Sequence, residues 1–496
     1  MLPAPCFRFE GKVRISNGYQ AISRQREAPV REFQANGAGC CRVVQLPCGS
    51  VTIVVAVVAA MLATDVSRAG ETLGGRDCPN IVLIMADDLG IDAMRVYGGQ
   101  SYATPNIDRL AAEGIRFNNA HANPYCTPSR SELLTGRYPF RTGTPRVIYD
   151  MQRHREFLDP ARHPSFARQL KQAGYRTAIA GKWQLSFLAE RDTIYDFGFD
   201  TYLCWQIVTA ENERTTRFYQ PHYRRDGVII ADQIKDRYGP EVLCDFLIEF
   251  IRDNREGPFL AYYAALLPHF PWVPTPDSQD QTMSAPELGP PGHKGEAKFF
   301  PDMLAYLDKN VGRLLATLDE LGIAEDTIVI FTGDNGTDQS IRSQWNDRWV
   351  LGGKGTLTDR ATRVPLLIRW PGRIEPGTTD DGLVEFADFL PTLCDLAGVP
   401  SVTEPIDGVS FASRMLASGS NDNRQASMKP WVHIQRAADR YLRSQHWIVT
   451  NRGLLRQVQP YPVDPAAVLR EQLDDADSGD VDRLEDQLRL LQEDAR

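Results

Sequence analysis

Two short acidic segments of the sequence offer oxygen atoms that could hold a metal ion. Asp87 and Asp88 are neighbours in MADDLG, and Asp334 and Asn335 are neighbours in TGDNG. Carboxylate and amide oxygens are the ligands that Ca²⁺ and Mg²⁺ prefer, and they suit zinc poorly. Adjacent carboxylates also repel each other unless a cation or a proton lies between them. These four residues predict a site for a divalent cation, although Asp-Asn-Gly alone is also a plain turn sequence.

Four further side chains could bind and protonate an anionic substrate. Arg130, Lys182 and Lys354 would form a pocket for a compact oxyanion, because arginine forks onto tetrahedral oxygens and lysine acts as a point charge. Each of the three could instead be an ordinary surface side chain. His269, which lies between prolines in LPHFP, is a candidate general acid, although a histidine beside a proline turn is often structural.

Cys126 stands among polar turn formers in NPYCTPSRSELLTGR, without a second cysteine close enough for a local metal site. Five cysteines follow the first 70 residues, namely Cys78, Cys126, Cys204, Cys244 and Cys394. An odd number leaves one thiol unpaired. The other four could form two disulfides in an oxidising compartment and leave Cys126 free, but buried free thiols are also common.

The residues with this chemistry follow short apolar runs of the length and composition of buried β-strands. The runs are residues 81–85 before Asp87, 176–180 before Lys182, the apolar part of 258–270 before His269, and 327–331 before Asp334. Apolar residues also recur at helical spacing from Met303 to Leu321, and a shorter helix is predicted over 165–173. Strands that alternate with helices predict an α/β fold with a mostly parallel sheet.

The position of these residues after the strands suggests one shared site. In open α/β sheets, ligands bind beyond the carboxyl ends of the strands. We therefore expect the polar residues that follow the four runs to converge. Any one of them, taken alone, could be a solvated loop residue.

Composition and the N-terminal region narrow the class of protein. The chain has 496 residues, 42% hydrophobic and 24% charged, which suits a main domain plus a smaller one. A net charge of −9 argues against wholesale binding to nucleic acid or an anionic membrane. The apolar stretch 51–63 is interpreted as the core of a secretory signal within 51–70, in a leader of residues 1–70. We expect an exported protein, periplasmic or secreted, with no stable membrane span in the mature chain; an uncleaved anchor is the alternative.

Several motifs together resemble one family. CTPSR followed by LLTGR resembles the signature of the type I sulfatases, formylglycine-dependent enzymes of the alkaline phosphatase-like superfamily. The resemblance continues in MADDLG, GKW, PHFP, TGDNG and GGKGTLTDRATRVPLLIRWPG, in the order of the family. It covers residues 78 to 410, and six motifs in sequence leave little room for chance.

The resemblance implies a role for each candidate residue. Cys126 would be oxidised to formylglycine, whose hydrate attacks sulfur and then releases sulfate. Asp87, Asp88, Asp334 and Asn335 would hold Ca²⁺, with Mg²⁺ or Mn²⁺ possible, and residue 126 would also contact the ion. Arg130 would orient the formylglycine, Lys182 and Lys354 would bind the sulfate, and His269 would protonate the departing alcohol.

The resemblance also implies the architecture. It predicts an alkaline phosphatase-like α/β fold with a large, mostly parallel mixed sheet sandwiched by helices, followed by a smaller C-terminal antiparallel sheet and a terminal helix. We assign the catalytic domain to residues 78–415 and the C-terminal subdomain to residues 428–496. The predicted terminal helix has apolar residues at helical spacing, namely Val481, Leu484, Leu488 and Leu491.

The sequence departs from the family pattern at two places. Gln184 stands where the family has a histidine after Gly-Lys-Trp, and glutamine cannot take up a proton near neutral pH. Slow turnover, another proton route and a decayed enzyme are the three hypotheses that follow. Residues 359–361, Asp-Arg-Ala, replace a turn that resembles Glu-Gly-Gly, so the backbone after Lys354 could follow another path.

Three functions are weighed. The first is a sulfuric ester hydrolase acting on an organic sulfate ester, with a preference for sulfated carbohydrate. The second is a phosphonate or phosphate ester hydrolase of the same superfamily. The third, prompted by Gln184, is a non-catalytic protein that binds sulfated glycans. The expected partners are a sulfated small molecule or glycan and a formylglycine-generating or anaerobic sulfatase-maturating enzyme.

Overall fold

The computed structural model describes residues 78–153, 157–282, 287, 293–400, 402–416 and 428–494. The predicted leader, residues 1–70, lies outside the described residues. Within them, the structure has no helix that is both long enough and apolar enough to cross a membrane.

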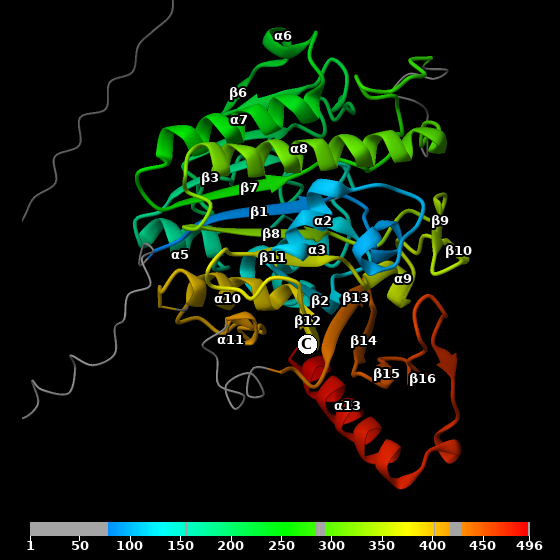
Figure 1. The fold of residues 1–496 in the computed structure, drawn as a ribbon. Helices are drawn as coiled ribbons and strands as arrows, with labels where there is room; N and C mark the ends of the chain where they lie inside the picture. The colour runs from blue at the N-terminus through cyan, green and yellow to red at the C-terminus, as the bar shows by residue number, and fades with distance from the viewer. Residues whose placement is uncertain are drawn as a thin grey trace, which may run out of the picture. The chain divides into compact units, whose positions relative to one another are not determined.

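A ten-stranded mixed sheet forms the centre of the described chain (Figure 1). In spatial order its strands are β12 (Thr378–Glu385), β2 (Ile115–His121), β11 (Leu366–Arg369), β8 (Thr327–Gly333), β1 (Asn80–Ala86), β7 (Phe259–Ala264), β3 (Arg176–Gly181), β4 (Thr201–Trp205), β5 (Tyr223–Arg225) and β6 (Val228–Ile229). The pairs β8–β1, β1–β7, β7–β3 and β3–β4 are parallel, whereas β11, β5 and β6 run antiparallel to their neighbours. The predicted mostly parallel sheet is confirmed.

The four predicted strands are neighbours in this sheet, and they end at the same level. Ala86 of β1 pairs with Gly333 of β8, and Gly181 of β3 pairs with Ala264 of β7. Met85 of β1 also pairs with Ala264. The residues that follow β8, β1, β7 and β3 therefore leave the sheet along one edge.

Alternate side chains of β1 supply two separate cores, because successive residues of a strand point to opposite faces of the sheet. Val82 and Ile84 belong to one hydrophobic cluster, and Ile81, Leu83 and Met85 belong to the other. All seven residues of β1 are buried. The strand consequently has a continuous apolar run, as expected when helices cover both faces.

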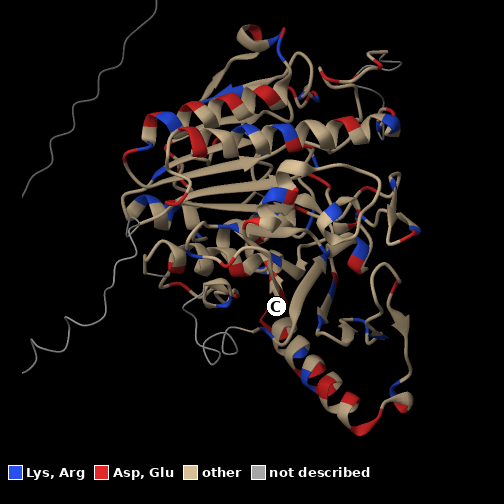
Figure 2. Ribbon diagram, viewed as in Figure 1, with Lys and Arg blue, Asp and Glu red and all other residues tan. Residues whose placement is uncertain are grey.

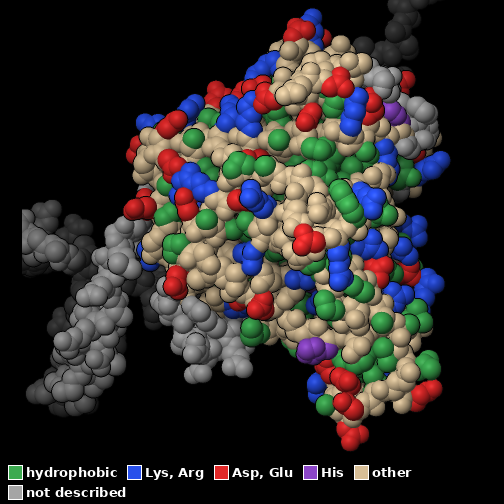
Figure 3. All heavy atoms as spheres, turned by 45° about the vertical axis from the view of Figure 1, so that its right-hand side comes forward, with side chains coloured by type: hydrophobic (Ala, Val, Ile, Leu, Met, Phe, Trp, Pro, Cys, Tyr) green, Lys and Arg blue, Asp and Glu red, His purple; other side chains and the backbone are tan. Residues whose placement is uncertain are grey.

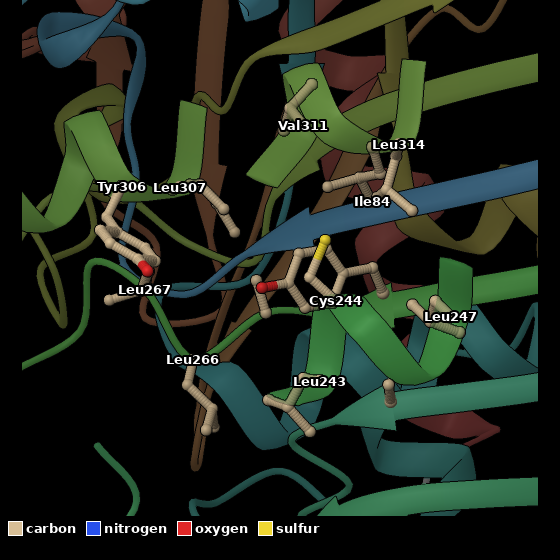
Figure 4. Packing of buried hydrophobic residues seen from close by; sticks show 14 of the residues in the cluster. Ile84, Leu243, Cys244, Leu247, Leu266, Leu267, Tyr306, Leu307, Val311 and Leu314 are labelled. Atoms are coloured by element: carbon tan, nitrogen blue, oxygen red, sulfur yellow. The ribbon is translucent and has the colours of Figure 1, made fainter. Parts of the chain in front are cut away.

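Helices cover the two faces. The first core is closed by α2 (Pro105–Ala112), α7 (Gly239–Asn254) and α8 (Phe300–Glu320), and Figure 4 shows Leu243 and Leu247 of α7 and Leu314 of α8 around Ile84. The second core is closed by α3 (Cys126–Thr135), α5 (Phe166–Gln172), α10 (Phe389–Leu396) and α11 (Ala412–Met415). The predicted helices over 165–173 and 303–321 are confirmed as α5 and α8.

Short elements complete this part of the chain. They are α4 (Pro139–Thr142), α6 (Ala231–Ile234), α9 (Asp359–Thr362), the hairpin of β9 (Arg342–Trp345) and β10 (Arg348–Leu351), and the 3₁₀ helices η1 (Ile91–Ala93), η2 (Arg95–Tyr97), η3 (Ala297–Phe299) and η4 (Phe386–Asp388).

The cysteines of the described residues form no disulfide; all five are free thiols. Cys244 lies in the first core, whereas Cys204 and Cys394 lie in the second. Because the sheet separates Cys244 from the other two, the pairing that we considered from the sequence is wrong. These buried thiols pack as small apolar side chains.

A second sheet follows, with five antiparallel strands. They are β13 (Val432–Arg436), β14 (Asp439–Arg443), β15 (Trp447–Thr450), β16 (Leu455–Gln457) and β17 (Ala466–Ala467), followed by η5 (Arg470–Gln472) and α13 (Asp475–Glu493). The four apolar residues predicted on the terminal helix are buried and pack in one cluster with Leu442, Trp447 and Val449. The predicted antiparallel sheet and terminal helix are confirmed.

Charged residues are mixed over the surface. Lys and Arg alternate with Asp and Glu along α7, α8 and α13 (Figure 2). Figure 3 shows both signs on the side that it brings forward, with several Lys and Arg side chains near its right-hand margin. Because both signs are interspersed, an anionic ligand would be held by local charges.

Candidate active site

The structure brings the predicted acidic residues together at the shared edge of the sheet. Asp87 and Asp88 follow β1, Asp334 and Asn335 follow β8, and none of the four is more than 1% exposed. Asp88 has a φ of 64°, which turns the chain sharply after β1. Its backbone N–H donates to Asp334 Oδ1 at 3.0 Å, and Asn335 Nδ2 donates to Asp88 Oδ1 at 2.8 Å. These bonds fasten the two acidic segments to each other.

Two lysines contact the first acidic pair. Lys182 follows β3, and its Nζ lies 2.9 and 2.7 Å from the two carboxylate oxygens of Asp87. Lys354 follows β10, and its Nζ lies 2.6 Å from Asp88 Oδ2. Both lysines are largely enclosed, with side chains 1% and 12% exposed. They therefore hold their charges inside the site and not in solvent.

Arg130 contacts the second acidic segment. Its Nε and Nη2 donate to Asp334 Oδ2 at 3.1 and 2.7 Å, and its Nη1 donates to the carbonyl of Lys182 at 3.1 Å. Burial and the neighbouring carboxylate of Asp87 raise the pKa of Asp334 to about 7 despite this guanidinium. For Asp87, burial alone would raise the pKa, but Lys182, His269 and Arg130 outweigh it and lower the pKa. The site thus still favours an added positive charge near Asp334.

The donors suit a hard divalent cation. Asp87, Asp88 and His269 each offer one atom within 4.8 Å of the others. Asn335 Oδ1 is enclosed and has no hydrogen-bond partner, which a bound cation would provide. Carboxylate and amide oxygens in this number are typical ligands of Ca²⁺. The residues present therefore fit such an ion, and the structure adds His269 to the group as a neighbour that the sequence assigned to another role.

Cys126 is the first residue of α3. Proline is tolerated at Pro128 because the first turn of a helix needs no donor there, and the helix ends at Gly136 with a φ of 66°. Arg130 lies one turn after Cys126 on the same side of the helix. Cys126 is only 2% exposed, and burial raises the pKa of its thiol. The helix thus presents both residues of the CTPSR motif to the site.

His269 follows β7 and contacts Lys354. Its Nδ1 lies 2.5 Å from the carbonyl oxygen of Phe270, and its Nε2 lies 3.2 Å from Lys354 Nζ and 3.5 Å from Asp88 Oδ2. Because a carbonyl can only accept, Nδ1 carries the hydrogen and Nε2 accepts from the lysine. Burial, with Lys354 nearby, lowers the pKa of His269 well below its ordinary value.

Gln184, at which the sequence departs from the pattern that it resembles, has a φ of 53°. Its Nε2 donates to the carbonyl of Ile148 at 3.1 Å, and its Oε1 is enclosed without a hydrogen-bond partner. A buried acceptor without a donor is costly. The glutamine is therefore held at one end and offers a free acceptor at the other.

A cavity of about 1030 Å³ opens over these residues. Cys126, Lys182, Gln184, His269 and Lys354 line it. Residues 202–227 supply a large part of the wall, namely Trp205, Ile207, Val208, Asn212, Arg214, Thr215 and Arg217. From the loop 274–298, Glu287, His293 and Lys294 also line the cavity. Sequence reasoning missed Arg153 and Asp338 in the wall, because no motif marks them, and it gave no role to Tyr125, the residue before Cys126.

The departure at residues 359–361 forms α9, a single helical turn. Asp359 receives two hydrogen bonds from Arg443 of β14, at 3.2 and 3.0 Å, and both side chains are nearly enclosed. Arg360 pairs with Asp464. This turn therefore ties the segment after Lys354 to the C-terminal sheet.

Two family models and several known proteins match this chain. The family model described as "Sulfatase" matches residues 79–399, and the model described as "N-sulphoglucosamine sulphohydrolase, C-terminal" matches residues 348–452. Arylsulfatase A of Homo sapiens is 32% identical over 377 residues, which cover 71% of this chain and 70% of that protein. N-acetylgalactosamine-6-sulfatase of Rattus norvegicus is 31% identical over 385 residues, which cover 69% of this chain and 67% of that protein.

The fold also has solved counterparts. The crystal structure of Ps i-CgsB superposes with a TM-score of 0.66 at 22% identity and covers 84% of this chain and 93% of that chain. At this identity the likeness concerns the fold alone.

Proposed function

The chain belongs to the sulfatase family and is a sulfuric ester hydrolase, and we propose that it releases sulfate from a sulfated carbohydrate with a nucleophile made from Cys126. One observation carries the proposal. Cys126 lines the same cavity as Lys182 and Lys354, and both lysines contact the buried acidic pair after β1.

Two groups that the chain itself does not contain would complete the site. Asp87, Asp88, Asp334 and Asn335 would hold Ca²⁺, or Mg²⁺ or Mn²⁺ in its place, which would supply positive charge opposite the sulfate oxygens. A formylglycine made from Cys126 would supply, as its hydrate, the hydroxyl that attacks sulfur. Its formation would need a formylglycine-generating or anaerobic sulfatase-maturating enzyme as a partner.

The residues of the chain would bind and orient the ester. Lys182 and Lys354 would hold sulfate oxygens and offset the charge that develops as the S–O bond breaks, which is the kind of contribution that is usually largest. Arg130, fixed between Asp334 and the carbonyl of Lys182, would keep residue 126 in place. His269 would first take up a proton at Nε2, where it accepts a hydrogen bond from Lys354 Nζ, and would then pass that proton to the departing alcohol.

The substrate class rests on the relatives and on the cavity. The rat relative is named as a sulfatase of N-acetylgalactosamine, and the cavity of this chain has room for a sugar ring with its neighbours. Export to the periplasm or the outside is a further proposal, supported by the apolar residues 51–63.

The test is sulfate release by protein co-expressed with a maturation enzyme. N-acetylgalactosamine 6-sulfate, an aryl sulfate and an aryl phosphonate ester would be compared at equal concentration, with Cys126→Ala as the control. We expect the sulfated sugar to give the highest kcat/KM and the control to be inactive. Preference for the phosphonate, or release by the control, would contradict the proposal.

A further inference from the structure

Most of the cations in the wall of the cavity have a carboxylate partner. Lys182 contacts Asp87 at 2.7 Å, Lys354 contacts Asp88 at 2.6 Å, Lys294 contacts Asp338 at 2.7 Å, and Arg153 lies 3.5 Å from Asp150. Their charges are balanced within the protein. Ion pairing of this kind is the usual condition for a charged group that is kept from water.

Arg217 differs from these cations. It lines the cavity and is only 7% exposed, yet no carboxylate of the described residues lies within ion-pair distance of its guanidinium. Glu287, the acid whose charge acts most strongly on Arg217, has its hydrogen bonds elsewhere. Its carboxylate accepts the backbone N–H groups of Arg217, Phe218 and Tyr219, at 2.6, 3.1 and 3.0 Å.

The side chain of Arg217 is nevertheless held firmly. Its guanidinium carbon lies 4.5 Å from the ring centre of Trp205 and 5.2 Å from that of Phe218. Its Nη2 donates to the carbonyl of Phe270. Stacking on a tryptophan and one hydrogen bond fix the plane of the guanidinium, while Glu287 fixes the backbone beneath it.

The remaining donors of Arg217 are open to the cavity. An arginine has five N–H donors, and the carbonyl of Phe270 uses one of them. None of the nitrogens of Arg217 is both enclosed and without a partner. The unused donors therefore face the space that the side chain lines. Burial lowers the pKa of Arg217, so an anion placed there would relieve an energetic cost.

We propose that Arg217 binds a second anionic group of the substrate, a sulfate or a carboxylate, close to the ester that is hydrolysed. A planar guanidinium with two free N–H groups matches two oxygens of either anion. The inference deepens the proposed function, since it takes the cavity as the substrate site, and it names the substrates as polyanionic sugars.

The position of Arg217 indicates that the second anion lies near the first. The carbonyl of Phe270 that Arg217 contacts is also the partner of His269 Nδ1, and His269 Nε2 contacts Lys354 Nζ. The carbonyl of Phe270 and the imidazole ring of His269 thus lie between the guanidinium of Arg217 and a lysine of the sulfate site. A second anion on the same sugar ring or on the next one would reach this guanidinium.

The experiment measures binding, which does not depend on turnover. Cys126→Ala protein, with and without Arg217→Met, would be titrated by calorimetry with three ligands. They are N-acetylgalactosamine 6-sulfate, its 4,6-disulfate, and a disaccharide of glucuronate and N-acetylgalactosamine 6-sulfate. We expect Arg217→Met to lower the affinity for one or both dianionic ligands by about 10- to 100-fold, which corresponds to the loss of a charge-assisted hydrogen bond. Binding of the monosulfate should change less than about 3-fold, because Arg217 would make no contact with its single sulfate and such effects are nearly independent.

A loss of affinity for the disulfate alone would identify the second anion as a sulfate, and a loss for the glucuronate disaccharide alone would identify it as a carboxylate. Arg217→Lys keeps the positive charge but loses the paired N–H donors of the guanidinium. Its affinity for the dianionic ligands should therefore lie between those of the wild type and Arg217→Met. Arg342→Met is the matched control, because Arg342 lies 5.0 Å above the ring of Trp349 outside the cavity. An equal loss for all three ligands, or no loss for any, would overturn the inference, provided that the thermal midpoints of the variants agree. If the mature enzyme releases no sulfate but Arg217 still discriminates these ligands, the proposed function fails and the inference stands.

Discussion

The contact between Asp359 and Arg443 provides a sharp prediction, because it joins the segment after Lys354 to the C-terminal sheet. The side chains of Asp359 and Arg443 are 6% and 3% exposed. Burial alone would raise the pKa of Asp359, but the Arg443 guanidinium outweighs it and lowers the pKa from 3.8 to about 2. A difference of this size between folded and unfolded states corresponds to about 2 kcal/mol of stability.

Asp359→Asn should cost more than this figure, because it leaves the charge of Arg443 enclosed without a partner. Breaking a buried pair on one side typically costs about 3–5 kcal/mol. Arg360→Gln is the matched control: its partner Asp464 is 51% exposed and Arg360 is 22% exposed, so the loss should stay below about 1 kcal/mol. Urea unfolding at pH 7 measures both values.

The dependence on pH follows from the sign of the shift. Since the folded pKa lies below the unfolded value of 3.8, the stabilisation is fully present above pH 4 and is lost as the pH falls toward 2. The difference between wild type and Asp359→Asn should therefore shrink between pH 4 and pH 3. Equal losses in Asp359→Asn and Arg360→Gln at pH 7, or a difference that grows on acidification, would refute this reasoning.

Three other predictions concern the site and the terminal helix. Gln184→His should raise kcat for sulfate release, by as much as about 10²-fold if a missing acid or base limits turnover; no gain would show that the glutamine is native to the mechanism. Dialysis against EDTA should lower both sulfate release and the thermal midpoint, and Ca²⁺ should restore both, whereas an unchanged midpoint and rate would argue against a bound cation near Asp334. Leu488→Ala should lower the free energy of unfolding by about 2–5 kcal/mol, because Leu488 is 3% exposed in its cluster; a loss below about 1 kcal/mol would contradict that packing.

Much of the fold was predictable because the signals are local. The apolar runs before Asp87, Lys182, His269 and Asp334 are strands. Since ligands bind beyond the carboxyl ends of parallel strands, the residues that follow these strands were expected to lie together. The order of those strands in the sheet, β8-β1-β7-β3, differs from their order in the chain. The strand order could not be read from the sequence, but the prediction that the site residues converge did not depend on that order. The helical spacing from Val481 to Leu491 likewise predicted α13.

The parts that escaped prediction depend on pairs of distant residues. Asp359 and Arg443 are 84 positions apart, and the motif that contains Asp359 gives no sign of Arg443 as its partner. Arg217 belongs to none of the sequence motifs quoted above. The ring of Trp205 stacks against its guanidinium, and the carboxylate of Glu287 accepts hydrogen bonds from backbone N–H groups and not from this side chain. Such non-local contacts become visible only once the chain is folded.

The identity of the side chain at position 126 tests the account most directly. Trypsin cleaves after Arg116 and Arg130, which releases residues 117–130 as one peptide. In protein from the native host that releases sulfate, the mass of this peptide should correspond to an aldehyde in place of the CH₂SH group. An unmodified thiol in a preparation that turns over sulfate esters would contradict the account.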